Sequence, residues 1–306
     1  MYADLVCKGG GVKGIALVGA LLYFEEYGYI WKKVAGTSVG AIVASLVAVG
    51  YTAKEIYDIM LKIDYHKFAD KNTLQSIPLI GPPTSLFYSK GIHAGAYVER
   101  FLSEKFEQKG KKYFKDIYEN GESKLKVIAS DVTRHKLIVL PDDLVDYNIN
   151  PMKFEIAKAV RMSLSIPFFF EPVILNKKGN PSYIVDGGLL SNFPIWIFDV
   201  SDRPRWPTFG LNLYNNVQNS NSNPHGLISY LMDVIETSLS TSEEIYFKDC
   251  DCVRIVNIPT LGISTINFDI TKEEMTSLFN SGYNSAKSFL ETWDFNSYIN
   301  NFRLWF

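Results

Sequence analysis

Apolar residues gather in runs of two kinds, and these runs predict that strands and helices alternate along the chain. Leu5–Cys7 and Tyr183–Val185 are short and mostly apolar, which is typical of buried strands. Val12–Tyr27 is longer and repeats apolar residues every three or four positions, which predicts a helix. Alternation of this kind indicates a three-layer α/β/α sandwich with a mostly parallel central sheet. We expect further strands at Val34–Ala35, Leu125–Ala129, Leu137–Leu140, Phe209–Leu213 and Val253–Val256, and further helices from Gly40 to Val49 and at Lys54–Ile63, Ile92–Phe106, Phe154–Met162, Ile228–Leu239 and Lys272–Leu290.

Composition excludes several classes of protein. The 306 residues are 47% hydrophobic and 21% charged, which allows a sizeable core and rules out a disordered chain. Lys and Arg total 31 against 33 for Asp and Glu, so the net charge of −2 argues against a surface built for nucleic acid. Prolines and a glycine break the periodicity between residues 65 and 90, where we expect a loop or cap. Because no internal repeat or clear linker is present, we expect a single domain over residues 1–306.

Cysteine usage and the length of apolar segments bear on the compartment. Three cysteines, Cys7, Cys250 and Cys252, do not make a disulfide scaffold, which favours a reducing, cytoplasmic location. No second cysteine pair and no histidine lie near Cys250 and Cys252, so we expect no metal site. No signal peptide is indicated, and the most apolar stretch, Val34–Val49, is shorter than the roughly 20 residues of a spanning helix. We therefore expect a protein that is soluble or peripheral at membranes.

The first motif that carries chemistry is a glycine-rich turn between a predicted strand and a predicted helix. Successive glycines let several backbone N–H groups face one point, and the helix N-terminus adds a positive dipole. Such a turn, which we call the glycine nest, binds an anion or an oxyanion that exists only in a transition state. The same glycines also fit the dinucleotide fingerprint, or a turn without any ligand. The glycine nest comprises Gly9, Gly10, Gly11, Val12, Lys13 and Gly14.

The second motif is Gly36-Thr37-Ser38-Val39-Gly40, a G-x-S-x-G sequence between a short strand and a helix of small residues. That is the context of a nucleophile elbow, in which glycines permit a tight turn that projects the serine hydroxyl above the sheet. The competing interpretation makes Ser38 a structural helix N-cap.

The third motif is Asp186-Gly187-Gly188, directly after a predicted strand. In a parallel sheet, ligands sit at the carboxyl ends of strands, so an aspartate placed there can act as a base. Asp-Gly is also a common turn dipeptide, and the motif alone does not separate the two interpretations.

The three motifs in this order resemble the patatin-like phospholipase family. That family carries a glycine-rich oxyanion hole, a G-x-S-x-G nucleophile and a D-G-[GA] base, and all three stand intact here. Arg161–Pro167 with the following aromatics, and Ser191–Pro194, resemble further family segments. The resemblance covers about residues 4–200, and residues 201–306 carry no motif that we recognise. It implies a patatin-like fold and a lipid acyl hydrolase that works without a cofactor.

The resemblance also implies roles for individual residues. Asp186 accepts the proton of Ser38, Ser38 attacks the ester carbonyl, and N–H groups near Gly10 and Gly11 stabilise the oxyanion. Lys13 either supports that charge or is a solvated residue of the first helical turn. Lys8 departs from the small or acidic residue that the family often has before the glycines.

Other polar residues have plainer interpretations. Asp131 resembles a family aspartate at a strand end, and we expect structural hydrogen bonding there. A triad with a late histidine, His225, is the alternative to a Ser–Asp dyad. We expect His66, His93 and His135 to have surface or capping roles.

Surrounding residues suggest how lipid would be met. Ile166–Phe170 and Leu86–Tyr88 line an acyl channel or belong to the core. A lipase must meet a membrane surface, where basic residues attract anionic lipid and aromatics favour the interface. The segment that we consider for this contact, with a solvated loop as the alternative, contains Lys109, Lys111, Lys112, Lys115, Tyr113 and Phe114.

Two other functions compete with hydrolysis. A dinucleotide-binding oxidoreductase requires an acidic residue at the end of the second strand, about 20 positions after the fingerprint, and Gly36-Thr37-Ser38 stands there instead. A catalytically silent lipid-binding or interaction protein on the same fold does not need both Ser38 and Asp186. The sequence indicates neither an activating protein partner nor an oligomeric state.

Overall fold

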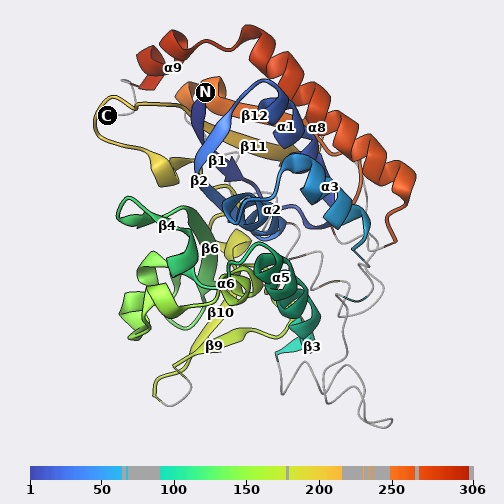
Figure 1. Cartoon of the computed structure of the whole chain (residues 1–306). Helices are drawn as coiled ribbons and strands as arrows, with labels where there is room; N and C mark the ends of the chain where they lie inside the picture. Colours follow the sequence, from blue (N-terminus) through green and yellow to red (C-terminus); the bar gives the residue numbers. More distant parts are fainter. Residues whose placement is uncertain are drawn as a thin grey trace.

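The computed structural model of the chain describes residues 1–63, 67, 90–176, 179–215, 230, 234, 237, 249–265 and 269–302. A central sheet has the strand order β12-β11-β1-β2-β6-β10-β9, with β7 pairing to β6 outside this order. Helices flank the sheet (Figure 1). The strands are β1 (Tyr2–Cys7), β2 (Ile30–Thr37), β6 (Leu125–Asp131), β7 (Lys136–Leu140), β9 (Val173–Leu175), β10 (Ser182–Asp186), β11 (Thr208–Tyr214) and β12 (Ile255–Pro259).

Five neighbouring strands of the sheet run parallel, from β12 through β11, β1 and β2 to β6. The strands β7, β9 and β10 are antiparallel to their partners. The fold is therefore mixed α/β with a mostly parallel sheet, as the alternation of apolar runs predicts. Two small ribbons lie apart from it, β3 (Gly91–His93) with β8 (Phe168–Phe170) and β4 (Tyr118–Glu119) with β5 (Glu122–Ser123).

The helices pack on the sheet through one large apolar core. Alternate residues of β1 and β2, such as Leu5, Cys7 and Val34, face this core, while Val6 and Ala35 face the opposite side. On that opposite side a short 3-10 segment, η7 (Ile195–Phe198), packs against the sheet. The α-helices are α1 (Ile15–Glu26), α2 (Val39–Ala48), α3 (Ala53–Leu61), α5 (Ala96–Gln108), α6 (Ile156–Ser163), α8 (Lys272–Thr292) and α9 (Phe295–Phe302).

Residues beyond 200 contribute to the same sheet. The strand β11 pairs with β1, and β12 pairs with β11 at the edge. The long helix α8 lies beside α1 (Figure 1). Every helix of the described residues is too short or too polar to cross a membrane.

Two predicted elements begin with residues that have another type of secondary structure. The predicted helix Ile92–Phe106 starts as strand β3, and α5 begins only at Ala96, because Gly95 has a φ of +68° and breaks the helix. The predicted strand at Val253 is instead the end of the 3-10 segment η8 (Asp249–Arg254), and β12 begins at Ile255. The predicted helix 228–239 and most of the predicted loop 65–90 lie outside the described residues.

The pairing around β6 positions the site. Residues 127–131 of β6 pair with β7 along one edge. Along the other edge, residues 125–128 pair with β2 and residues 129–131 pair with β10. The strands β2 and β10 therefore share one edge of β6 and meet there by their carboxyl ends. Sequence reasoning expected Asp186 at the end of a parallel strand, and the structure corrects this, because β10 approaches from the opposite direction.

Candidate active site

Ser38 and Asp186 come together because two strand ends meet. Thr37, the last residue of β2, is level with Ile128 of β6, and Asp186, the last residue of β10, is level with Ala129. Since Ile128 and Ala129 are consecutive, the residue after Thr37 lies beside Asp186. The Ser38 hydroxyl is close enough to the Asp186 carboxyl to lower its pKa.

Ser38 has the backbone of a nucleophile elbow. Its φ of 54° and ψ of −129° lie in a region that costs a non-glycine residue on the order of 1–3 kcal/mol. The hydroxyl makes no capping hydrogen bond to α2, so the N-cap interpretation finds no support. The Ser38 N–H instead donates to Oγ of Ser163, 2.9 Å away. The Ser38 side chain is nearly buried, and its hydroxyl makes no hydrogen bond to the first turn of α2.

The rest of the elbow explains why its glycines are needed. A Cβ on Gly36 would lie 2.3 Å from the carbonyl oxygen of Gly40, and one on Gly40 would lie 2.3 Å from that of Cys7. The turn is therefore packed backbone against backbone. The hydroxyl of Thr37 donates to the Ser191 carbonyl at 3.1 Å, and Val39 is buried against Gly14 of the glycine nest.

The glycine nest leaves two amides available. The Gly9 N–H donates to the carbonyl of Asn192 at 3.0 Å, and the Val12 N–H donates to that of Thr265 at 3.1 Å. Among the described residues, the N–H groups of Gly10 and Gly11 donate to no backbone carbonyl. These are the two amides that sequence reasoning placed nearest the oxyanion. Gly11 has a φ of +56°, a left-handed conformation that suits glycine.

The two lysines of this region differ in their surroundings. Lys8 is buried, and its Nζ donates to Oδ1 of Asn212 at 2.9 Å, while the amide of Asn212 donates to Asn257. The residue that departs from the family pattern is thus held among β1, β11 and β12 at the carboxyl ends of the parallel strands. Lys13 is half-buried with its side chain against Gly10, and its predicted role stays a prediction.

Burial gives the Asp186 carboxyl unusual electrostatics. The side chain is fully buried, and loss of hydration raises its pKa from 3.8 to about 7. The Gly188 N–H donates to Oδ1 at 2.7 Å and, with the Ser38 hydroxyl, lowers the pKa by a smaller amount. Oδ2 is buried and accepts no well-formed hydrogen bond from the described residues. Asp186 thus closes the Asp-Gly turn through Oδ1, while Oδ2 can accept a proton.

Gly187 completes the base motif by close packing, since a Cβ there would lie 2.3 Å from the Ile128 carbonyl oxygen. The base motif is therefore fixed against the strand that also holds the elbow.

The carboxyl end of α6 and the residues just after it contact both Ser38 and Asp186. Sequence reasoning did not identify these contacts. Ser163 accepts from the Ser38 N–H, and the Ser165 carbonyl accepts from the Asp186 N–H at 2.8 Å. The buried guanidinium of Arg161 donates to Oγ of Ser165 and to the carbonyls of Ala94 and Glu171. The resemblance of Arg161–Pro167 to a family segment pointed to this region. The contacts that these residues make could not be predicted, because they depend on tertiary packing.

Asp131 has the structural role that was expected. One carboxylate oxygen accepts the N–H groups of Thr133 and Arg134, and the other accepts the Tyr147 hydroxyl at 2.8 Å. The first two bonds close the turn from β6 to β7, and the third ties that turn to the segment after β7, so both carboxylate oxygens accept hydrogen bonds.

The structure describes two of the four histidines, His93 and His135. His93 packs its ring on Phe169, 4.6 Å between centroids, and His135 lies exposed in the turn after β6. Phe169 and Phe170 also contact one another, which favours a core role for them, while Phe168 is exposed. His66, His225 and Leu86–Tyr88 lie outside the described residues, so the triad with His225 stays a prediction.

The predicted basic membrane surface is not a free basic patch. Lys109 pairs with Glu55 at 2.9 Å, Lys112 lies within 4 Å of Glu107 and Glu155, and Phe114 is fully buried. The Lys112 carbonyl accepts from the first residue of α6, whereas Ser38 touches its last residue. The segment therefore lies at the end of α6 that is away from Ser38.

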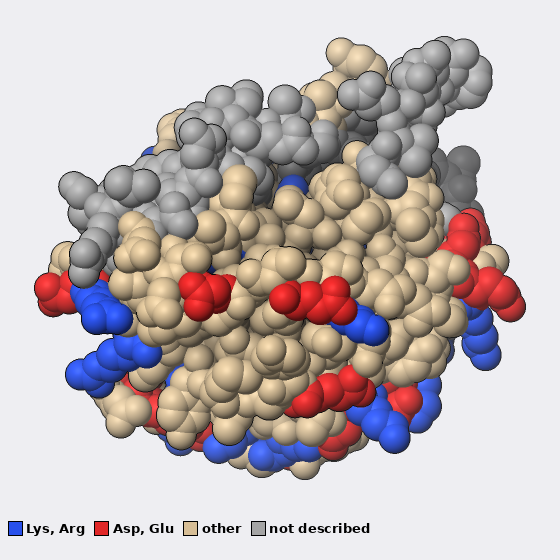
Figure 2. Space-filling model, turned by 90° about the horizontal axis from the view of Figure 1, so that it is seen from above, with Lys and Arg blue, Asp and Glu red and all other residues tan. Residues whose placement is uncertain are grey.

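Charge elsewhere is mixed. On the face drawn in Figure 2, acidic and basic side chains lie next to one another, so neither sign dominates that face. This agrees with the near-neutral composition. The absence of a nucleic-acid partner stays a prediction.

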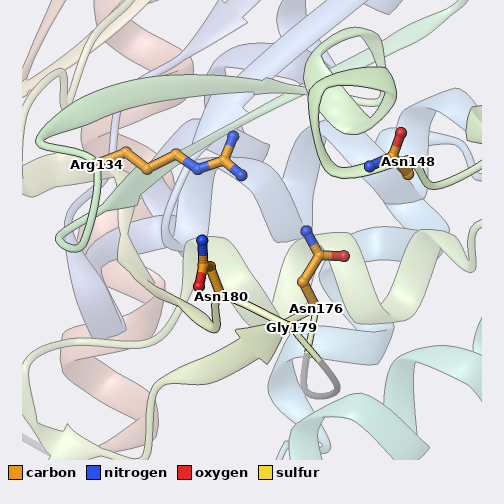
Figure 3. A pocket seen from close by; sticks show the side chains of 5 residues that line it. All are labelled: Arg134, Asn148, Asn176, Gly179 and Asn180. Atoms are coloured by element: carbon orange, nitrogen blue, oxygen red, sulfur yellow. The ribbon is translucent and has the colours of Figure 1, made fainter.

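A separate hollow of about 410 Å³ lies where the turn after β6 and the loop after β9 approach each other (Figure 3). Its Arg134 is already engaged, with the guanidinium 4.2 Å from the Tyr147 ring centre and donating to the Asp146 carbonyl. No residue of the three motifs contributes to it. It is lined by Arg134, Asn148, Asn176, Gly179 and Asn180.

Comparison with known proteins shows which family the chain resembles. The family model for patatin-like phospholipases matches residues 5–199, which include all three motifs. The uncharacterized protein YqhO of Bacillus subtilis (strain 168) is 36% identical over 297 residues, or 96% of this chain and 100% of that protein. A probable lipid hydrolase, 463L, of Invertebrate iridescent virus 6 is 27% identical over 93% of this chain and 88% of its own length.

The fold also matches a solved structure. VipD from Legionella pneumophila superposes with a TM-score of 0.58 over 95% of this chain and 67% of its own, at 19% identity. The elbow, the glycine nest and the strand-end aspartate lie within the segment that the family model matches, and the overall fold resembles that of VipD. The chain belongs to the patatin-like phospholipase family.

Proposed function

We propose that this protein is a lipid acyl hydrolase of the phospholipase A or lysophospholipase type, which cleaves fatty-acyl esters through a Ser38–Asp186 dyad. Membership of the family supports a lipid-acting hydrolase. The observation that carries the dyad is the meeting of the β2 and β10 ends on β6, which brings the Ser38 hydroxyl beside the buried Asp186 carboxyl. Burial raises the pKa of that carboxyl to about 7, close to that of an ordinary histidine. An aspartate with such a pKa is a far stronger base than usual, so it can take the part that histidine plays in a triad.

The acylation step follows from the positions of the groups. Asp186 takes the proton of the Ser38 hydroxyl as Oγ attacks the ester carbonyl carbon. The carbonyl oxygen becomes an oxyanion that the amides of Gly10 and Gly11 stabilise. When the carbon–oxygen bond to the alcohol breaks, Asp186 returns the proton to the leaving oxygen. The product is a fatty-acyl ester of Ser38 and a free alcohol.

Deacylation repeats the sequence with water. Asp186 removes a proton from water, the hydroxide attacks the acyl-enzyme, and the same two amides stabilise the second oxyanion. Ser38 leaves as the alkoxide and regains a proton from Asp186, which releases the fatty acid. No cofactor takes part in either step. The substrate is presented at a membrane surface, which the protein meets peripherally in the cytoplasm.

The competing proposal is a silent lipid-binding protein on the same fold. A buried carboxyl with a raised pKa opposes it, because burying that group destabilises the folded chain and binding alone does not require it. We therefore favour hydrolysis.

Fatty-acid release from mixed anionic phospholipid vesicles tests the proposal. Wild type, Ser38→Ala and Asp186→Asn are assayed in parallel, and each variant is checked for folding. We expect release by wild type and a loss of at least about 1000-fold in both variants. Release that survives in Ser38→Ala would overturn the dyad.

A further inference from the structure

Ser191 and Asn192, which come shortly after the base motif, touch both of the other motifs. The Ser191 carbonyl accepts from the hydroxyl of Thr37 in the nucleophile elbow, at 3.1 Å. The Asn192 carbonyl accepts from the N–H of Gly9 in the glycine nest, at 3.0 Å. Both residues are nearly buried. These two consecutive residues therefore fix the position of the elbow relative to the glycine nest. Stabilisation of the oxyanion depends on the distance between the two.

The backbone bond to Asn192 also determines which amides remain available. Because the Gly9 N–H donates to the Asn192 carbonyl, the orientation of the peptide group before Gly9 is fixed. The next two amides, those of Gly10 and Gly11, then donate to no carbonyl of the described backbone.

The Asn192 side chain lies where nucleophile and nest meet. A Cβ built on Gly9 would be 2.1 Å from Oδ1 of Asn192 and 3.1 Å from Cβ of Ser38. The carboxamide thus packs against the Gly9 Cα, and the same side of that Cα faces Ser38. An ester carbonyl attacked by Ser38 and held by the next two amides must form its oxyanion beside this carboxamide.

We propose that Asn192 is a positioning residue for acyl transfer, and that its side chain must be uncharged. This inference rests on the proposed function. The backbone carbonyl holds the glycine nest in register with Ser38, and the carboxamide fills the space beside Gly9 without adding charge. One negative charge is present there throughout acylation, on the Asp186 carboxylate before proton transfer and on the oxyanion after it. A second negative charge at residue 192 would oppose it in both places.

Two substitutions separate charge from packing. Asn192→Asp keeps the size of the side chain and the backbone bond but places a carboxylate beside the oxyanion. Asn192→Ala removes the carboxamide and adds no charge. Asn148→Asp makes the same charge change at an exposed asparagine that belongs to none of the motifs (Figure 3). All three and wild type are assayed for hydrolysis of a soluble p-nitrophenyl acyl ester from pH 5.5 to 9, with unfolding midpoints measured alongside.

We expect Asn192→Asp to lower kcat at pH 8 by about 100-fold, the loss seen when an oxyanion donor is removed. Its activity should rise at a higher pH than that of wild type, because a neighbouring carboxylate raises the pKa of Asp186. We expect Asn192→Ala to lose about tenfold in kcat with the wild-type pH midpoint, since it lacks that charge. Asn148→Asp should match wild type in both.

Two results would overturn the inference while leaving the proposed function intact. One is an Asn192→Asp variant with the kcat and pH midpoint of wild type. The other is equal loss in the Asp and Ala variants with an unshifted midpoint, which would reduce Asn192 to a packing residue. A folded wild-type protein that neither hydrolyses the ester nor reacts with a fluorophosphonate would instead refute the proposed function, and this inference with it.

Discussion

Replacing the buried base with its neutral isostere should make the protein more stable as well as inactive. In the folded chain the Asp186 pKa is about 7, against 3.8 for an unperturbed aspartate. Between these two pH values the folded state holds a proton that the unfolded state has released. Stability therefore falls by about 1.4 kcal/mol for each pH unit from pH 4 to pH 7 and then stays level. Above pH 7 the total cost is about 4 kcal/mol.

Asp186→Asn removes this cost and keeps the local bonds. The asparagine oxygen can accept from the Gly188 N–H, as Oδ1 does now, and its amide can donate to the Ser38 hydroxyl. We expect the free energy of unfolding at pH 8 to rise by up to about 4 kcal/mol, and the gain to shrink toward zero near pH 4. Urea unfolding of wild type and variant at pH 8, 6 and 4.5 measures this.

Asp131→Asn is the matched control. Its carboxylate is also fully buried, but both oxygens already accept hydrogen bonds, and the asparagine would lose one acceptor. We expect it to destabilise the protein by about 1–3 kcal/mol at pH 8. The reasoning about Asp186 is refuted if Asp186→Asn is no more stable than wild type at pH 8, or if its gain does not change with pH.

Three further predictions follow from the site. Esterase kcat/KM should rise with pH and level off above a midpoint near 7, because the ionised Asp186 is the active form; a flat profile between pH 5.5 and 8 would exclude it as the base. Ser163→Ala should lower kcat about tenfold and destabilise the protein by about 1–3 kcal/mol, because the Ser38 N–H loses its buried acceptor; unchanged kinetics would show that this bond does not position the nucleophile. Lys111→Glu with Lys115→Glu should leave vesicle hydrolysis within about twofold of wild type, because this segment lies at the end of α6 away from Ser38; a loss of vesicle sedimentation would restore it as a membrane contact.

The local parts of the site could be predicted because each is encoded in consecutive residues. The glycine nest and the elbow are short turns whose glycines stand where backbones touch, as at Gly36 and Gly40. The strand before Asp186 was also predicted from its apolar run. Such signals do not depend on what the chain does elsewhere.

The non-local parts could not be predicted. Nothing in the β10 sequence says that it runs antiparallel and meets β2 end to end, because this depends on which edge of β6 is open. The contacts of Ser163 and Asn192 with the motifs join residues more than 100 positions apart. The sequence predicts a helix where the short strand β3 lies, since three residues are too few to show a period. The predicted single domain and the compartment remain predictions.

Covalent labelling of the nucleophile tests the central claim most directly. Wild type, Ser38→Ala and Asp186→Asn are incubated with a fluorophosphonate at pH 8, and the modified peptide is identified by mass spectrometry. The dyad predicts one label per wild-type chain, on Ser38, with none on Ser38→Ala and much slower labelling of Asp186→Asn. Labelling of another residue, or equal rates in wild type and Asp186→Asn, would contradict it.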